Sequence, residues 1–309
     1  MDWFKEYKEL VFSHEINVEN VNKAIKIKFE NLPSTLFKYR QINDNSINNL
    51  EQDTIWLSDP RNFNDPYDCS FTTETELNPE SSNFIISIAQ EAGLLDLLND
   101  DKIEEVQNSL SPLVTLMEHS YPNNPEHGKK IGRALASVMK QRGANLVSEI
   151  SEGMKQAFKV CSFSEDPSSV LMWSHYAQYH QGFCIAYDFK ELGCEDIRTR
   201  LMCPTIYSEK LFDASNSFGN KNSVNNILFL NQAALMKSKA WSYEKEWRLV
   251  FGNGTLTKEM PYKVPKPKFI ILGTKISEKN KERITSICES KNIQVKQMLM
   301  SESAFELNF

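Results

Sequence analysis

The stretch Val160-Cys161-Ser162-Phe163-Ser164 decides the fold class, because strand signals return here after a long helical segment. Residues 80–158 place apolar side chains at helical spacing, for example over 103–117 and 131–157, with almost no strand signal. Residues 160–164 therefore mark the place where a sheet resumes behind a block of helices.

Strand-like segments lie on both sides of this block. Residues 36–40 and 54–58 precede it, whereas 182–187 and 246–251 follow it. Neither set looks self-sufficient, so one sheet interrupted by a helical insertion at about 80–158 is the most economical interpretation. We expect an α+β fold, with a central mixed, mostly antiparallel sheet flanked by helices, in which residues 1–309 form a single domain.

The two ends of the sequence extend this plan. Residues 1–33 alternate charged and apolar positions at helical spacing until Pro33, which predicts an N-terminal helical arm. Residues 265–300 contain a strand pattern, a helix pattern and a second strand pattern, which predicts a closing βαβ-like unit.

Composition restricts the class of protein. The 309 residues carry 41 acidic and 35 basic side chains, and the formal charge of -6 gives no whole-chain attraction for nucleic acid. The six cysteines form no CxxC pair and have no zinc-type spacing, so we expect reduced thiols. The sequence shows neither a signal peptide nor about 18 consecutive apolar residues, which predicts a cytoplasmic protein without membrane contact.

The first polar cluster follows the strand at 36–40. Tyr39 and Arg40 end this strand, and Ser58 precedes a turn that contains Asn64 and Asp65. An arginine beside such a turn can bind a phosphate or a carboxylate through two parallel hydrogen bonds. Alternatively, Asn64 and Asp65 only build the turn before the proline that follows them.

The second cluster combines a serine strand with an aromatic helix. Ser162 and Ser164 lie on the strand, and Trp173, His175 and Tyr176 lie on a helix expected at 169–179. This aromatic helix could stack a planar ligand, or it could pack in the core around a satisfied histidine. No two histidines have the spacing of a helical zinc pair, so we expect no metal site here.

The third cluster is Glu244, Glu246 and Arg248, which would share one face of a strand at period two. Two neighbouring carboxylates repel each other unless a cation, a metal or a sugar hydroxyl separates them, so this spacing indicates a site. The alternative is a solvent-exposed edge strand with a simple Glu246–Arg248 pair.

Together these pieces resemble a widespread bacterial family catalogued as a domain of unknown function, number 2971. They run in order from residue 36 to residue 273 and include Tyr39-Arg40, Phe63-Asn64-Asp65-Pro66, Met172-Trp173 with His175-Tyr176, and Trp241 with Glu244, Glu246 and Arg248. The family name implies no activity, although its members often look like stand-alone proteins of mobile or anti-phage loci.

The order Arg40, Ser162-Phe163-Ser164 and Glu244-Lys245-Glu246 is also similar to the arginine, Ser-x-Ser and Glu-x-Glu elements of ADP-ribosyltransferases. This resemblance implies a toxin or anti-phage effector that uses NAD and modifies an unknown acceptor, either protein or nucleic acid. Arg40 would contact NAD, and Ser162 and Ser164 would line its pocket. Glu246 would be catalytic at the glycosidic bond, and Glu244 would orient the acceptor.

The same resemblance implies that Tyr176 or Trp173 stacks on the nicotinamide ring of NAD. Phe163 departs from the family pattern, since Ser-Thr-Ser is usual at these three positions. The interval between Arg40 and the serine strand is also enlarged by the helical insertion.

Two further functions remain open. One is a magnesium-dependent nuclease or phosphodiesterase. Its metal ligands would be the carboxylates of Asp65, Asp68, Glu244 and Glu246, and Lys237 or Lys239 would bind the phosphate. A non-enzymatic module would instead bind a nucleotide or a partner through its aromatic side chains. The helices at 80–158 could form a lid, a dimer surface or a partner contact.

Overall fold

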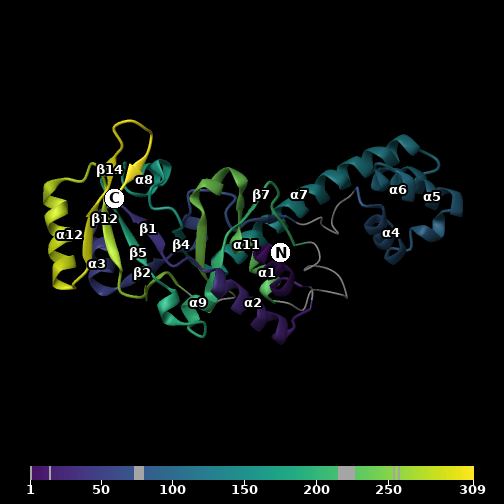
Figure 1. The fold of residues 1–309 in the computed structure, drawn as a ribbon. Helices are drawn as coiled ribbons and strands as arrows, with labels where there is room; N and C mark the ends of the chain where they lie inside the picture. Colours follow the sequence, from purple (N-terminus) through teal and green to yellow (C-terminus); the bar gives the residue numbers. More distant parts are fainter. Residues whose placement is uncertain (1, 14, 73–79, 215–226, 253–254, 257) are drawn as a thin grey trace. The chain divides into compact units, whose positions relative to one another are not determined.

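The computed structural model describes residues 2–13, 15–72, 80–214, 227–252, 255–256 and 258–309 (Figure 1). Two compact units divide the chain. One unit comprises Met1–Ser70, Met154–Phe212 and Val224–Phe309, and the other comprises Phe71–Gly153 and Asp213–Ser223.

The first unit is built on a mixed sheet that has seven strands among the described residues, in the order β13-β12-β5-β1-β4-β10-β6. Their bounds are Gln294–Gln297, Phe269–Leu272, Phe183–Tyr187, Leu36–Arg40, Lys159–Ser164, Glu246–Phe251 and Met202–Pro204. β12 and β13 pair in parallel, and the other neighbouring strands pair antiparallel. The structure thus confirms the α+β class and the mostly antiparallel sheet.

The described residues also form smaller strand pairs that are separate from this sheet. They are β2 (Thr54–Leu57) with β11 (Met260–Lys263), β7 (Ile206–Ser208) with β9 (Met236–Ser238), β14 (Leu299–Met300) with β15 (Leu307–Asn308), and β3 (Phe71–Thr72) with β8 (Phe212–Asp213).

The helices of the first unit are α1 (Trp3–Val11), α2 (Val18–Asn31), α3 (Asp44–Gln52), α8 (Val170–Tyr176), α9 (Ile197–Leu201), α10 (Ile227–Leu230), α11 (Gln232–Leu235) and α12 (Glu278–Ser290). Short 3-10 helices cover Pro60–Asn62, Lys190–Leu192 and Lys239–Glu244. The helices α1 and α2 lie within the predicted arm, and β12, α12 and β13 lie within the predicted closing unit.

The second unit contains α4 (Ser82–Glu91), α5 (Asp100–Asn108), α6 (Pro112–Ser120), most of α7 (Pro125–Ala157) and a 3-10 turn at Leu95–Leu97. The helix expected over 103–117 is split in two, because Pro112 begins α6 and a proline cannot continue the preceding helix. In the described part of the chain, no helix is long and apolar enough to cross a membrane.

The two faces of the large sheet carry different cores. On one face, Phe163, Trp247 and Leu249 belong to a core cluster that also contains residues of α3 and α12. On the other face, Tyr39 packs against Trp173 of α8. This second face also presents Ser162, Ser164, Glu246 and Arg248, since Glu246 lies opposite Ser164 and Arg248 lies opposite Ser162. The sheet therefore positions the predicted serine and carboxylate motifs side by side.

Candidate functional site

A sharp bend separates the two glutamates of the Glu-x-Glu motif. Glu244 ends the 3-10 helix at Lys239–Glu244, and Glu246 begins β10. Lys245 between them adopts a left-handed conformation with φ 44°, so the prediction that Glu244 lies on the strand is wrong. The hydroxyl of Ser164 donates to the carbonyl of Glu244 over 2.6 Å and fixes this bend against β4.

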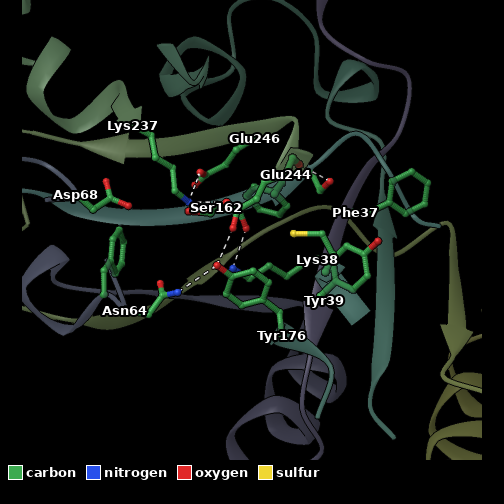
Figure 2. A pocket seen from close by; sticks show the side chains of 14 residues that line it. Phe37, Lys38, Tyr39, Asn64, Asp68, Ser162, Tyr176, Lys237, Glu244 and Glu246 are labelled. Atoms are coloured by element: carbon green, nitrogen blue, oxygen red, sulfur yellow. Dashed lines mark hydrogen bonds and ion pairs between the residues drawn. The ribbon is translucent and has the colours of Figure 1, made fainter. Parts of the chain in front are cut away.

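Lys237 of β9 joins the two carboxylates (Figure 2). Its ammonium group donates to Oε2 of Glu244 and, over 3.0 Å, to Oε2 of Glu246. The hydroxyl of Tyr176 donates to the other oxygen of Glu244 over 2.7 Å, and the side-chain amide of Asn64 donates to that hydroxyl over 3.4 Å. Three chain segments far apart in sequence, at residues 64, 176 and 237–246, thus meet around one carboxylate.

Arg248 extends the cluster beneath Glu246. Its Nε donates to Oε1 of Glu246 over 2.9 Å, and its two terminal nitrogens donate to both oxygens of Asp68 over 2.6 and 2.8 Å. Arg248 is fully buried and β10 lies between β4 and β6, so the edge-strand alternative is wrong. Two cations and three carboxylates therefore share one buried network, with a net charge of one negative unit when all are ionised.

The two glutamates have opposite pKa shifts. Burial alone would raise the pKa of Glu246, but the charges of Arg248 and Lys237 lower it well below its usual range. Burial raises the pKa of Glu244, and the attraction of Lys237 only partly offsets this effect. Glu246 is thus held as an anion, whereas Glu244 is the more basic carboxylate of the pair.

Two adjoining cavities reach this network. The carboxylate cavity, of about 170 Å³, is lined by Asp68, Lys237, Glu244 and Glu246 among others. The wide cavity, of about 610 Å³, is within the usual size range of small-molecule sites. Both cavities are lined by Lys38, Tyr39, Phe63, Ser162 and Tyr176.

The wide cavity opens where β1 and β4 separate. Among the described residues these strands share one opposed pair, Phe37 with Ser164. Beyond this pair the ammonium group of Lys38 donates to the carbonyl of Ser162 over 2.7 Å, and Ser58 instead pairs with Val160 of β4. The side chain of Lys38 therefore joins β1 and β4 at the place where a regular sheet would have backbone–backbone hydrogen bonds.

Most of the predicted site residues line these cavities. The carboxylate cavity is lined by Tyr39, Asn64, Ser162, Ser164, Tyr176, Glu244 and Glu246, and the wide cavity by Tyr39, Arg40, Ser58, Ser162, His175 and Tyr176.

Two predicted residues line neither cavity. Trp173 is fully buried, and its indole nitrogen donates to the carbonyl of Pro167 over 2.8 Å. One carboxylate oxygen of Asp65 accepts from the backbone of Tyr67 over 2.9 Å, as expected if Asp65 builds the turn. The structure thus gives Trp173 a place in the core and gives Asp65 a local hydrogen bond.

Arg40 and Glu246 do not share a cavity. Arg40 lies opposite Phe183 on β5, on the sheet face that carries Trp247, whereas Glu246 lies on the other face. Burial lowers the pKa of Arg40. Ser162 is one of the five residues that line both cavities and so lie between the surroundings of Arg40 and those of Glu246.

Sequence reasoning missed several cavity residues. Lys38 adjoins Tyr39 and Arg40 in the first polar cluster but was given no role, because a lysine in a strand gives no local signal of a hydrogen bond across the sheet. Outside the two cavity linings, Tyr207 was missed as well, although its hydroxyl accepts from the backbone of Glu246 over 2.8 Å. Tyr179 was not proposed as a site residue, and it lines the wide cavity from beyond the end of α8.

The described residues include no group of three or more His, Cys, Asp or Glu side chains that could hold a metal ion. The carboxylates of the network face Lys237 and Arg248 instead, and these cations occupy the positions that a metal would take. The donor set therefore fits an ion-paired site better than a metal centre.

Residues 172–249 match a family model described as protein of unknown function (DUF2971), which confirms the resemblance to that family. The matched segment contains most of α8, Lys237, both glutamates and Arg248. No curated protein and no solved structure matches the chain.

Proposed function

We propose that this chain, whose residues 172–249 match the DUF2971 family, transfers ADP-ribose from NAD to an acceptor nucleophile. One observation carries the proposal: the paired carboxylates of Glu244 and Glu246 line a cavity beside the serine strand and have opposite pKa shifts. Two carboxylates in different environments are suited to two different roles at one glycosidic bond.

Glu246 is suited to stabilise positive charge. Its oxygens accept hydrogen bonds from Arg248 and Lys237, and its low pKa keeps it ionised at neutral pH. Cleavage of the bond between ribose and nicotinamide builds positive charge on the ribose ring, and a fixed anion in a buried site lowers the energy of that state.

Glu244 is suited to act as the general base, because its pKa lies above that of an ordinary glutamate. The bond from C1′ of the ribose to the nicotinamide nitrogen breaks, and its electron pair leaves with nicotinamide, which becomes neutral. The acceptor forms the new bond to C1′ and passes its proton to Glu244, which later releases it to water.

The distribution of charge between the cavities supports NAD as the donor. The lining of the carboxylate cavity has three acidic residues, Asp68, Glu244 and Glu246, and two lysines, Lys38 and Lys237. The described lining of the wide cavity has Lys38 and Arg40 and no acidic residue. NAD has a cationic nicotinamide ring at one end, and its anionic pyrophosphate lies in the middle of the molecule, between the two riboses. In this arrangement Tyr176, at the junction, would stack on nicotinamide.

A magnesium-dependent nuclease fits this geometry less well. Asp68 has both carboxylate oxygens bound to Arg248, and Glu246 is bound to Arg248 and Lys237. A divalent cation would have to displace these buried partners before it could coordinate the same oxygens.

The test is incubation with NAD labelled in its adenosine half, together with cell extract. We expect free nicotinamide and label that becomes acid-precipitable, and sensitivity of that label to protease or to nuclease identifies the acceptor class. Modification of a host macromolecule in the cytoplasm would be the toxic or anti-phage action of such an enzyme.

Glu246→Gln should abolish nicotinamide release, and Glu209→Gln should retain it. Glu209 is an exposed carboxylate paired with Lys239, so its substitution is the same chemical change outside the network. Wild-type protein that releases no nicotinamide and labels no fraction of the extract would contradict the proposal.

A further inference from the structure

Two large aromatic rings are exposed at the wide cavity. Trp56 is the exposed position of the otherwise buried strand β2 and is 40% exposed, and Tyr179 is 73% exposed. Neither ring is used by the network around Glu246. Exposed aromatic rings in a cavity are the usual platforms on which nucleobases stack.

A strained turn presents Tyr179. Gln178, Tyr179 and His180 all have left-handed backbone conformations, with φ 51°, 53° and 69°. Three consecutive non-glycine residues in this region cost conformational free energy and persist only where surrounding contacts hold them. This turn ends α8 at Tyr176, so the helix expected over 169–179 is shorter than predicted.

The surrounding structure holds this turn closely. The backbone of His180 donates to the carbonyl of Trp173 over 3.2 Å, and its ring stacks on Trp173 and contacts the hydroxyl of Ser174 over 3.0 Å. Gly273 passes so near that a Cβ there would lie 2.2 Å from the carbonyl oxygen of His180. The surrounding contacts keep this unfavourable backbone conformation in place, which indicates that the fixed position of the Tyr179 ring serves a function.

Carboxamide side chains line the same cavity. Gln178 accepts a hydrogen bond from the backbone of Ile42 over 3.4 Å, which ties the strained turn to the loop after β1. Gln41 and Asn45 also line the cavity, and in the described part of the chain their side chains have no hydrogen-bond partner. A carboxamide offers a donor and an acceptor together, which matches the edge of a nucleobase.

We infer that the wide cavity is a nucleobase subsite, in which the adenine ring of a nucleotide stacks on Tyr179 and Trp56. Gln41 and Asn45 contact the edge of the base, and Lys38 and Arg40 supply positive charge for the attached phosphate. This inference rests on the proposed function in naming adenine, because NAD carries that base on the far side of its pyrophosphate from nicotinamide.

Calorimetric titration with AMP and with ribose 5-phosphate tests the subsite without any turnover. Both compounds carry one phosphate on a ribose, but only AMP carries a base. We expect AMP to bind and ribose 5-phosphate to bind at least about tenfold more weakly, the effect of losing one stacked base. Equal affinities, or no binding of AMP, would overturn the inference.

Substitutions locate the stacking. Tyr179→Ala should weaken AMP binding about tenfold, whereas Tyr179→Phe, which keeps the ring, should bind AMP as the wild type does. Trp56→Ala provides a second variant at an exposed strand position if Tyr179→Ala does not fold. Unchanged affinity in the folded alanine variants would show that the base binds elsewhere.

The two proposals fail separately. If AMP binds as described but no extract supports release of nicotinamide from NAD, the transferase proposal is lost and the nucleobase subsite stands. If NAD is cleaved while AMP does not bind and Tyr179→Ala leaves KM for NAD unchanged, the subsite is lost and the transferase proposal stands.

Discussion

The ammonium nitrogen of Lys237 lies 3.0 Å from a carboxylate oxygen of Glu246, and the same nitrogen binds Glu244. One lysine thus neutralises part of the charge on two glutamates that would otherwise repel each other. Burial would lower the pKa of Lys237, but these carboxylates raise it above its ordinary value, so the lysine stays charged. The relationship makes Lys237 central both to stability and to the proposed chemistry.

Replacement of Lys237 with methionine should destabilise the fold. The change leaves two buried carboxylates without their shared cation, and breaking such a buried pair costs about 3–5 kcal/mol of unfolding free energy. Urea denaturation followed by circular dichroism measures this loss. Lys239→Met provides the control, because Lys239 is 68% exposed in its pair with Glu209 and its loss should cost less than about 1 kcal/mol. Equal losses in the two variants would show that the buried network contributes little.

Tyr176→Phe should shift the pH profile of NAD cleavage. The hydroxyl of Tyr176 donates to Glu244 and lowers its pKa, so removal of that hydroxyl raises the pKa of Glu244 further. A general base works only when it is ionised, so the acid limb of kcat/KM should move to higher pH, by about one unit for one hydrogen bond. Tyr243→Phe changes a tyrosine whose hydroxyl does not bond to Glu244. It should leave the acid limb of kcat/KM at the same pH as in the wild type. If the pH profile of Tyr176→Phe is not shifted, Glu244 is not the general base.

Stability should fall in acid partly because of Glu246. Its pKa is lower in the folded state than in the unfolded chain, so its contribution is complete above the unfolded value of about 4.3 and is lost as the pH falls below that value. Unfolding free energies measured at pH 7, 5 and about 3.5 should therefore decline less steeply in Glu246→Gln than in the wild type. Glu209→Gln, at an exposed position, should keep the wild-type slope. Identical slopes in all three proteins would contradict the depressed pKa.

Gly273→Ala should lower the melting temperature. A Cβ at Gly273 would lie 2.2 Å from the carbonyl oxygen of His180, and relief of such a clash by backbone movement costs about 1–3 kcal/mol. Gly153→Ala in α7 is the matched control, because no atom lies within 4 Å of its added Cβ and alanine favours a helix by up to about 1 kcal/mol. A Gly273→Ala protein as stable as the wild type would mean that the left-handed turn can move freely.

The strands of the central sheet could be predicted from sequence because their signal is local. Residues 36–40 coincide with β1, and 160–164 lie within β4, since aromatic and other apolar side chains at these positions pack into buried cores on both faces of the sheet. The breaks in regular structure were harder to predict. The end of α8 and the bend at Lys245 depend on left-handed backbone that contacts from distant segments stabilise.

The serine and glutamate motifs were visible in the sequence, but their electrostatics were not. Arg248 binds Asp68 across 180 residues of sequence, and Lys38 reaches the carbonyl of Ser162 across 124. The side of the sheet on which Arg40 lies depends on its register with β5, which no motif encodes. Pairings at such separations become apparent only in the folded chain.

The separation of β1 from β4 has a mechanical consequence. Because one opposed pair, Phe37 with Ser164, joins the described parts of these strands, the large sheet consists of two half-sheets with a narrow seam between them. Tyr39 and Arg40 belong to one half, and Ser162 belongs to the other. A molecule bound in the wide cavity would contact both half-sheets. Its binding would therefore restrict the movement of one half-sheet relative to the other and make the sheet more rigid.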